Sequence, residues 1–414
     1  MNQRSKKILN DPVYGFINLP QGLIFDIVEH PYFQRLRRIK QTSLTHYVYP
    51  GALHTRFHHA LGAFHLTTQA VEVLRSKGAD ISEAEAEGLA VAVLLHDIGH
   101  GPFSHTLEHT LINVTHETLS VLFMQYLNTC FDNQLDIAIQ IFKDEYPKKF
   151  LHQLVSGQLD MDRMDYLNRD SFFTGVHEGV IGYDRIIKML AVQNGELVVE
   201  EKGIYSVEKF IIARRLMYWQ VYLHKTVLSA EQMLIQTFKR ARELSEQGLD
   251  LKAPDELKFF LNHRITAQDF LTNRDELLRR FAALDDYDIM AALKGWMQTE
   301  DTLLAFFSKS LIDRRLFKLK LSNEPFDPAY VAQIREKVEK ARLFPAALTD
   351  YLILQGKETN SAYSTTKDEI KILFKNGKVR PMSESADYGI ESKIVTKYYI
   401  CYPKLKSLEN IELA

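Results

Sequence analysis

Residues 94–105, Leu94-Leu-His-Asp-Ile-Gly-His-Gly-Pro-Phe-Ser-His105, place three histidines and one aspartate directly after the apolar run Leu89-Ala-Val-Ala-Val-Leu-Leu95. Upstream, Ser82-Glu-Ala-Glu85 matches a capping box, which predicts a helix that starts there and ends near Asp97, where Gly99 stops it. An apolar helix that ends in this much imidazole is either a hydrogen-bonded helix end or half of a metal site. Residues elsewhere in the chain must decide between the two.

The remaining sequence pattern is mainly helical. Apolar residues recur at helical spacing over residues 56–75, residues 206–245 are expected to form one long helix, and amphipathic segments continue to about residue 356. Asn-Gly pairs between apolar residues predict hairpins at 190–199 and 370–379, and the alternating residues 394–402 predict a further strand. We therefore expect a mainly α protein with a small β-containing region at the C-terminal end.

Composition restricts the function classes. The 414 residues carry a formal net charge of −2, so no overall field attracts nucleic acid or an anionic membrane. Only two cysteines occur, which fits a reducing compartment rather than a disulfide framework. The N-terminal residues lack the apolar core of a signal peptide, and the longest apolar run has seven residues, too few for a membrane span. We expect a cytoplasmic protein with no membrane partner.

Histidine is concentrated in the first half, where 13 of the 15 histidines lie at or before His177. His59 precedes the His96-Asp97 pair by 37 residues, and Asp162 follows that pair by 65. Taken singly, a histidine near an apolar helix is usually a hydrogen-bonded structural residue, and the acidic segment 160–170 is usually a solvated helix face. The order His, His-Asp, Asp instead indicates mixed nitrogen and carboxylate ligands for a divalent metal.

Four segments together resemble the HD-domain metal-dependent phosphohydrolases: residues 30–41, 49–59, 96–105 and 160–170. More narrowly, the chain is similar to the deoxynucleoside triphosphate triphosphohydrolases, which include a mammalian enzyme that joins a SAM domain to an HD domain. The resemblance covers roughly residues 5–230 and includes no SAM domain. It implies an HD-domain helical fold over residues 1–240. The amphipathic pattern predicts a helical extension over 241–357, and the strand patterns predict a small β-rich region over 358–414. Within that region, residues 358–367 are the best candidate for a linker. The β-rich region is expected to cover exposed helices, with an interaction surface as the alternative.

By this resemblance, the metal ligands are His59, His96, Asp97 and Asp162, and the metal is Mn, Fe, Mg or Zn. His105 and Glu108 lie three residues apart, so one helix face would hold both and the carboxylate would orient the imidazole for proton transfer. His100 and His116 match further active-site histidines, and the alternative is that they only support the ligands or cap a helix. The expected substrate-binding residues are Gln41, Arg56, Arg163, Tyr166, Asp170, Arg214 and Tyr222. The basic run Arg35, Arg37, Arg38 and Lys40 is expected to form a solvated or subunit-contact face instead.

Two departures from the family pattern border the expected sugar and base pocket. Thr42-Ser43-Leu44 follows Gln41 where the family has Leu-Gly, and Tyr218 replaces a histidine of the mammalian enzyme. The leading hypothesis is a dNTP triphosphohydrolase that releases deoxynucleoside and triphosphate. The alternatives are another HD-type phosphohydrolase (a nucleotide phosphatase, phosphodiesterase or nuclease) and a catalytically silent nucleotide-binding regulatory protein. The resemblance also implies a homo-oligomer, either dimer, tetramer or hexamer, and raises the question of a nucleotide effector.

Overall fold

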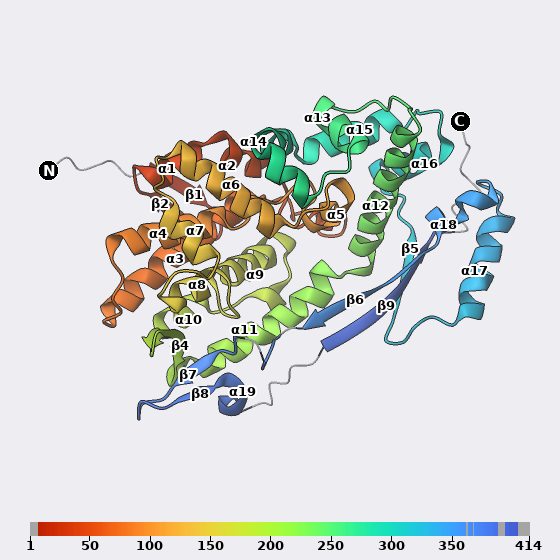
Figure 1. The fold of residues 1–414 in the computed structure, drawn as a ribbon. Coiled ribbons are helices and arrows are strands. Elements are labelled where there is room, and N and C mark those ends of the chain that lie inside the picture. Colours follow the sequence, from red (N-terminus) through yellow and green to blue (C-terminus); the bar gives the residue numbers. More distant parts are fainter. Residues whose placement is uncertain (1–6, 362, 367, 388–393, 405–414) are drawn as a thin grey trace.

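A computed structural model describes residues 7–361, 363–366, 368–387 and 394–404. The first half is a helical assembly that follows a short N-terminal hairpin, β1 (Lys7–Asp11) and β2 (Gly15–Leu19), at the left of Figure 1. Its helices are α1 (Leu23–Glu29), α2 (Pro31–Gln34), α3 (Arg56–Ser76), α4 (Glu83–Leu95), α5 (Glu108–Leu111), α6 (His116–Cys130), α7 (Asp136–Phe142), α8 (Lys149–Val155), α9 (Met161–Thr174) and α10 (Tyr183–Met189).

The second half continues with helices and two small sheets. The helices are α11 (Ile204–Met217), α12 (Lys225–Glu246), α13 (Asp255–Asn262), α14 (Ala267–Ala283), α15 (Asp286–Trp296), α16 (Thr302–Ile312), α17 (Pro328–Lys340), α18 (Thr349–Leu352) and α19 (Met382–Ser385). The strands are β3 (Leu190–Gln193), β4 (Glu196–Glu200), β5 (Lys318–Ser322), β6 (Leu354–Ser361), β7 (Lys371–Leu373), β8 (Val379–Pro381) and β9 (Ile394–Tyr402). The mainly α fold with a small β-containing C-terminal region is confirmed.

Three helices form the frame of the candidate site. Helix α3 packs against both α4 and α9. The apolar run of α4 is buried throughout, so this helix is fixed on all sides by the core. Its predicted capping box is confirmed, since the Ser82 hydroxyl accepts from Glu85 N–H and the Glu85 carboxylate accepts from Ser82 N–H at 2.8 Å. An ideal Cβ on Gly62 of α3 would lie 2.0 Å from Asp165 Oδ1, so only glycine allows α3 to approach α9 this closely.

The prediction of one long helix over 206–245 was wrong. Helix α11 ends at Met217, the five residues Tyr218–Tyr222 form a π-helical turn, and α12 starts only at Lys225. The wide turn is closed by a bond from Leu223 N–H to Tyr218 C=O, and the His224 side chain caps α12 by accepting from Thr226 N–H at 3.2 Å. Helical periodicity runs through the whole stretch, so the break carried no signal in the apolar pattern.

Both predicted hairpins are present, and the tertiary structure joins them. In the first turn, Asn194 and Gly195 have φ of 54° and 78°, as a tight hairpin with an Asn-Gly pair requires. Strand β4 pairs in parallel with β7, which makes the sheet β3-β4-β7-β8 from segments far apart in sequence. The predicted strand 394–402 is β9, at the centre of the sheet β5-β9-β6.

The expected linker 358–367 was partly wrong, because β6 runs to Ser361 and pairs with β9. Residues 362 and 367 of that linker lie outside the described residues, as do parts of the predicted C-terminal region. The three-part division of the chain stays a prediction, and the sheet β5-β9-β6 takes strands from both its second and third parts. Within the part of the chain that the structure describes, no helix is long and apolar enough to cross a bilayer.

Candidate metal centre and substrate cavity

The four predicted metal ligands converge from three helices. His59 lies on α3, His96 and Asp97 follow the last residue of α4, and Asp162 lies in the first turn of α9. The Nε2 atoms of His59 and His96 face each other at 3.2 Å, and Asp162 Oδ1 lies 3.1 Å and 3.5 Å from them. Asp97 oxygens lie 3.6 Å from His59 Nε2 and 3.4 Å from His96 Nε2.

These separations fit a shared divalent cation. Donors bound at about 2.1 Å at angles near 100° lie about 3.2 Å from one another. Two imidazole nitrogens that face each other with no hydrogen between them repel unless a cation lies between them. The set of two nitrogens and two carboxylates suits a divalent metal and does not select which one.

The electrostatics of the cluster favour positive charge. Burial lowers the pKa of His59, but the carboxylates of Asp162 and Asp165 outweigh it and raise that pKa to about 10. Burial raises the pKa of Asp97, but the Arg56 guanidinium and two neighbouring histidines hold it well below its usual range. Carboxylates that favour a proton on His59 also favour a divalent cation at the same atoms, so metal and proton compete for the site.

A second layer fixes the orientation of His59. Asp165 Oδ2 accepts from His59 Nδ1 at 2.7 Å, and Arg169 donates to both Asp165 oxygens at 3.0 Å. A further bond of 2.7 Å links Arg169 to Asp11 of β1. The His59, Asp165 and Arg169 side chains are fully buried. A carboxylate on Nδ1 fixes the imidazole tautomer that leaves Nε2 free for a metal.

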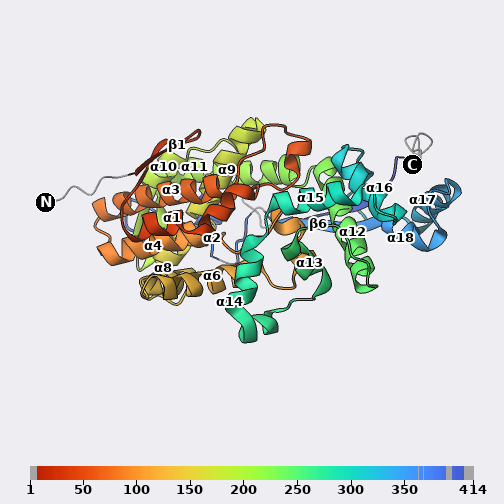
Figure 2. The ribbon, with the colours of Figure 1, turned by 90° about the horizontal axis from the view of Figure 1, so that it is seen from above.

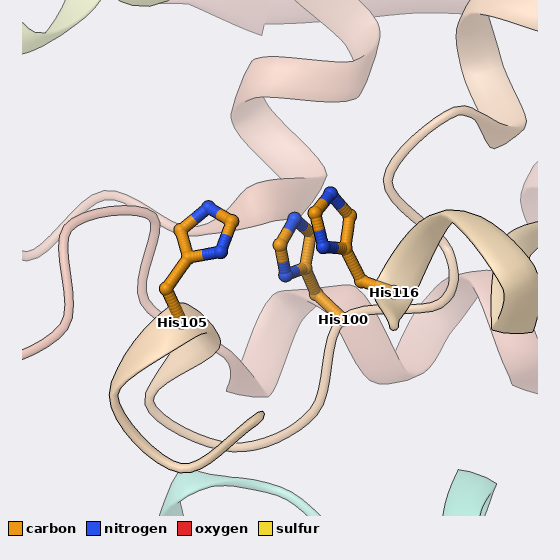
Figure 3. Close-up of side chains that lie close together, drawn as sticks. All are labelled: His100, His105 and His116. Atoms are coloured by element: carbon orange, nitrogen blue, oxygen red, sulfur yellow. The ribbon is translucent and has the colours of Figure 1, made fainter. Parts of the chain in front are cut away.

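Near the metal ligands, three more histidines form a cluster of their own, whose side chains Figure 3 shows. His100 and His116 are stacked, with ring centroids 3.9 Å apart and planes 15° apart, while His105 stands edge-on to both. Stacked imidazoles direct their in-plane lone pairs side by side rather than toward one point, so these rings are not arranged to share a second metal. His100 Nε2 lies 3.3 Å from Asp97, a predicted ligand, so His100 links the metal cluster to His116.

Glu108 connects the other two histidines. Its carboxylate accepts from His105 Nδ1 at 2.9 Å, from His116 Nδ1 at 2.8 Å and from His116 N–H at 2.7 Å. Burial raises the pKa of Glu108, but these hydrogen bonds bring it far below its ordinary value. The predicted contact between His105 and Glu108 is confirmed, although a 3-10 turn at Ser104–Thr106 and the start of α5 carry them rather than one helix. An ionised carboxylate therefore orients both rings at physiological pH.

The expectation of a solvated basic face at residues 35–40 was wrong for Arg35. Its side chain is 1% exposed and donates to the backbone oxygens of Ile98 and His100, at 3.3 Å and 2.6 Å. Arg35 thereby fixes the backbone of the loop that follows the ligands His96 and Asp97. Asp286 of α15 accepts from Phe103 N–H at 2.8 Å, and Phe103 holds a left-handed conformation with φ of 54°. A non-glycine residue in that conformation persists only where its surroundings fix it.

A cavity of about 720 Å³ opens beside this cluster. The three histidines His100, His105 and His116 line it, as do Asp97 and Asp162. All seven predicted substrate-binding residues also line it, namely Gln41, Arg56, Arg163, Tyr166, Asp170, Arg214 and Tyr222. Its volume is within the range of small-molecule sites. The structure thus brings the predicted metal, proton-transfer and substrate residues to one place.

The three arginines in the cavity differ in how free they are. Arg56 donates to Ser104 at 2.9 Å and pairs with Asp97. Arg163 pairs with Asp160 and the backbone oxygen of Gly157. Arg214, in the last turn of α11, has a buried Nε with no hydrogen-bond partner among the described residues. A buried guanidinium nitrogen without a partner calls for an anionic ligand.

Comparisons with known proteins agree with this geometry. An HD domain model matches residues 56–170 and an HD associated region matches 181–264. A phosphohydrolase from Bacteroides thetaiotaomicron, known from a crystal structure, is 50% identical to this chain and superposes with a TM-score of 0.93. The match covers 97% of this chain and 100% of that one. The chain is an HD-domain phosphohydrolase. Its metal dependence follows from the family and from the His/Asp cluster.

Other relatives of this phosphohydrolase are more distant. The uncharacterized protein YwfO from Bacillus subtilis is 29% identical over 96% of the chain and 92% of that protein. The human deoxynucleoside triphosphate triphosphohydrolase SAMHD1 is 30% identical over 58% of the chain. The match spans only 45% of the human protein, so the activity in its name does not transfer as a finding.

Several residues of the phosphohydrolase site were not identified from sequence. His54 Nε2 lies 2.6 Å from Asp170 Oδ1, while Tyr222 donates to Asp170 Oδ2 at 2.6 Å. Asp165 lies within the acidic segment 160–170. Its position about one helical turn after Asp162 could have indicated that it lies near the metal ligands. Glu231 on α12 and Glu358 on β6 also line the cavity. No motif marked either glutamate.

Proposed function

We propose that the protein is a dNTP triphosphohydrolase, which converts a dNTP and water into a deoxynucleoside and inorganic triphosphate. The observation that carries the proposal is one cavity that joins the metal cluster, Arg214 and the Asp170–Tyr222 pair. A nucleoside triphosphate needs these three features at once: cations for phosphates, a reaction centre and a polar pocket for the sugar. Relatives named as deoxynucleoside triphosphate triphosphohydrolases support the substrate class.

At the phosphate end, Arg214 would bind the phosphate oxygens directly, because its buried Nε has no hydrogen-bond partner in the described part of the chain. Arg56 would stabilise charge on the phosphates while keeping Asp97 ionised. A divalent metal held by His59, His96, Asp97 and Asp162 would supply Lewis acidity and an activated water. Attack of water on the α-phosphorus would break the bond to O5′, which would leave as the alcohol once it gains a proton.

The leaving oxygen would take its proton from His105. This side chain is 67% exposed and faces the cavity, and Glu108 holds its Nδ1. With Nδ1 held by the carboxylate, Nε2 is free to point at the leaving oxygen. Glu108 acts through His105 and is therefore a positioning residue.

At the sugar end, Asp170 and Gln41 would bind the 3′-hydroxyl. The ring of Tyr222 would pack against the deoxyribose and leave no room for a 2′-hydroxyl. The His54 ring stacks on Phe173, with ring centroids 4.5 Å apart, and its Nε2 lies 2.6 Å from Asp170 Oδ1. This contact fixes the orientation of the Asp170 carboxylate.

Product analysis tests the proposal. The full-length protein, loaded separately with Mn, Fe, Mg or Zn, is incubated with dNTPs, rNTPs, dNMPs and short single-stranded DNA. Tripolyphosphate and deoxynucleoside from dNTPs, with rNTPs cleaved much more slowly, would support it, and His96→Ala should abolish the reaction. Monophosphate from dNMPs or DNA with intact dNTPs would instead show another phosphohydrolase activity. Saturable dNTP binding without turnover in metal-loaded protein would show a regulatory protein.

We also propose that the protein is a homo-oligomer, either dimer, tetramer or hexamer, and that a nucleotide effector acts at a subunit interface. The argument is family resemblance. Light scattering with and without dNTPs tests it, and a monomeric mass under both conditions would contradict it.

A further inference from the structure

The turn that carries His105 is strained and is held in place by its surroundings. Phe103 and Ser104 have φ of 54° and 51°, left-handed conformations that non-glycine residues keep only where neighbouring contacts fix them. At the start of the 3-10 turn Ser104–Thr106, the Ser104 hydroxyl accepts from Arg56 Nε at 2.9 Å. The backbone of this turn sets the place from which the His105 imidazole enters the cavity.

A network of two hydroxyls and one carboxyl holds the other end of the turn. Helix α12, drawn in green in Figures 1 and 2, contacts the turn and carries Glu231. The hydroxyl oxygens of Thr106 and Ser43 lie 2.9 Å apart, and each hydroxyl is hydrogen-bonded to the Glu231 carboxyl. Because Thr106 and Ser43 are buried, α12 is connected to the turn through groups that are shielded from bulk water.

Ser43 stands where the resembling family has a glycine. Its φ of 50° is left-handed, a conformation that glycine adopts without steric cost and serine does not. The serine in this place therefore costs some backbone strain, and it contributes the hydroxyl that contacts Thr106 and Glu231. The departure from the family pattern thus supplies one of the three members of the network.

The number of hydrogens in the network favours a neutral Glu231. The three groups make three contacts with one another, whereas the two hydroxyls supply only one hydrogen each. An ionised carboxylate supplies none, so in one of the contacts two oxygens would face each other without a hydrogen between them. A protonated carboxyl supplies the third hydrogen and closes a ring in which every group donates once and accepts once.

The electrostatic surroundings of Glu231 also favour its neutral form. Burial raises the pKa of Glu231 from its ordinary value of 4.5 to about 7, while the two hydroxyls lower it and the neighbouring Glu358 of β6 raises it. Among the described residues, no lysine, arginine or histidine of the elements packed against α12 changes this pKa. His105, on the adjacent turn, is hydrogen-bonded to Glu108 at 2.9 Å. Glu231 is therefore neutral below about pH 7 and ionised above it.

We propose that Glu231 is a positioning residue for proton transfer: as a neutral acid it closes the network that fixes the turn carrying His105, and its ionisation releases that turn. The inference rests on the proposed function, in which His105 gives its proton to the leaving oxygen. Glu231 acts through Thr106 and needs no contact with the substrate in this role. The expected consequence is a loss of kcat as the pH rises through about 7, in addition to the titration of His105 itself.

The first test is the pH dependence of kcat for metal-loaded full-length protein with saturating dNTP. Glu231→Gln keeps one donor and one acceptor in the network but cannot ionise. The ratio of wild-type to Glu231→Gln kcat cancels every titration that the two proteins share. We expect this ratio to be constant below about pH 6 and to fall by about threefold to tenfold by about pH 8.5, the range for one hydrogen bond. Glu231→Ala should have a low kcat at every pH.

The second test needs no activity. Hydrogen exchange of residues 103–107 reports how firmly the turn is held, because Thr106 N–H donates to Phe103 C=O at 3.1 Å. Wild type and Glu231→Gln are compared at the same pH, so that the intrinsic exchange rates are equal. We expect equal exchange at about pH 6, and about threefold to tenfold faster exchange in wild type at about pH 8.5.

Two further variants sharpen the outcome. Glu358→Gln removes the charge that raises the pKa of Glu231, so the change in both readouts should move to lower pH. Glu246 lies on the same helix and pairs with Arg264 outside the substrate cavity, so Glu246→Gln should follow wild type throughout.

The results that would overturn the inference are distinct from failure of the proposed function. A kcat ratio that does not change with pH would overturn it, as would an effect of Glu231→Gln on KM alone, which would indicate simple repulsion of the triphosphate. If no dNTP is cleaved, the proposed function fails, and hydrogen exchange decides on Glu231: equal exchange of residues 103–107 at both pH values would overturn the inference.

Discussion

The Asp165→Asn variant tests how far metal binding depends on Asp165, which is not a ligand but orients the ligand His59. Asp165 accepts from His59 Nδ1 at 2.7 Å and from Nε and Nη2 of Arg169 at 3.0 Å, and all three side chains are buried. Asparagine has nearly the same volume but no charge, and one of its two positions becomes a donor. Both the tautomer and the basicity of His59 therefore lose their support.

The magnitude follows from these contacts. Loss of an outer carboxylate on a ligating imidazole costs about tenfold to a hundredfold in metal affinity, or about 1.4–2.7 kcal/mol. In addition, Arg169 keeps Asp11 as its one charged partner among the described residues, and breaking a buried pair costs about 3 kcal/mol in the free energy of unfolding.

Two measurements separate these effects. Titration of Mn²⁺ against a competing chelator gives the metal dissociation constant of the folded variant, and urea unfolding with excess chelator gives the stability of the metal-free protein. Asp250→Asn, which removes an exposed pair with Lys258, is the control and should change neither quantity. A folded Asp165→Asn protein that binds Mn²⁺ within about twofold of wild type would refute the reasoning.

Three further predictions use other contacts. Glu108→Gln should lower kcat by about a hundredfold with unchanged metal content, because the carboxylate that orients His105 and His116 is lost; unchanged kcat would contradict the proposed proton transfer. Tyr222→Phe removes the 2.6 Å bond to Asp170 and should raise KM for dNTPs by about tenfold with little change in kcat, whereas the exposed Tyr287→Phe should change neither. Burial raises the pKa of Glu85, but hydrogen bonds from Ser82 N–H, Lys148 and Tyr146 bring it to about 2. Since the folded pKa lies below the ordinary 4.5, this stabilisation is complete above pH 4.5 and is lost as the pH falls toward 2, so Glu85→Gln should cost about 2 kcal/mol at pH 7 and progressively less below pH 4. A cost independent of pH in urea unfolding would be evidence against that ion pair.

The local sequence determined the helices around the metal cluster. The α4 capping box, the apolar run after it and the two Asn-Gly turns depend on neighbouring residues only, so periodicity and turn chemistry were sufficient to predict them. The order and spacing of His59, His96-Asp97 and Asp162, together with the family resemblance, nominated four ligands, and in the structure both histidines lie within 3.6 Å of each of the two aspartates. Their number and type limit the chemistry before any fold is known.

Contacts between distant segments were decided only by the tertiary structure. The charge on Arg35 predicted a surface residue, yet three backbone oxygens on two segments satisfy it in the core. Helical periodicity hid the π-turn at Tyr218–Tyr222, because the i→i+5 bond changes the backbone without changing which residues are apolar. Glu231 and Glu358 are 127 residues apart and belong to no motif, so only the tertiary structure brings them to one cavity. Sequence alone could name the metal ligands, because a metal requires particular atoms, whereas the shape of the substrate cavity depends on how separate helices and strands pack.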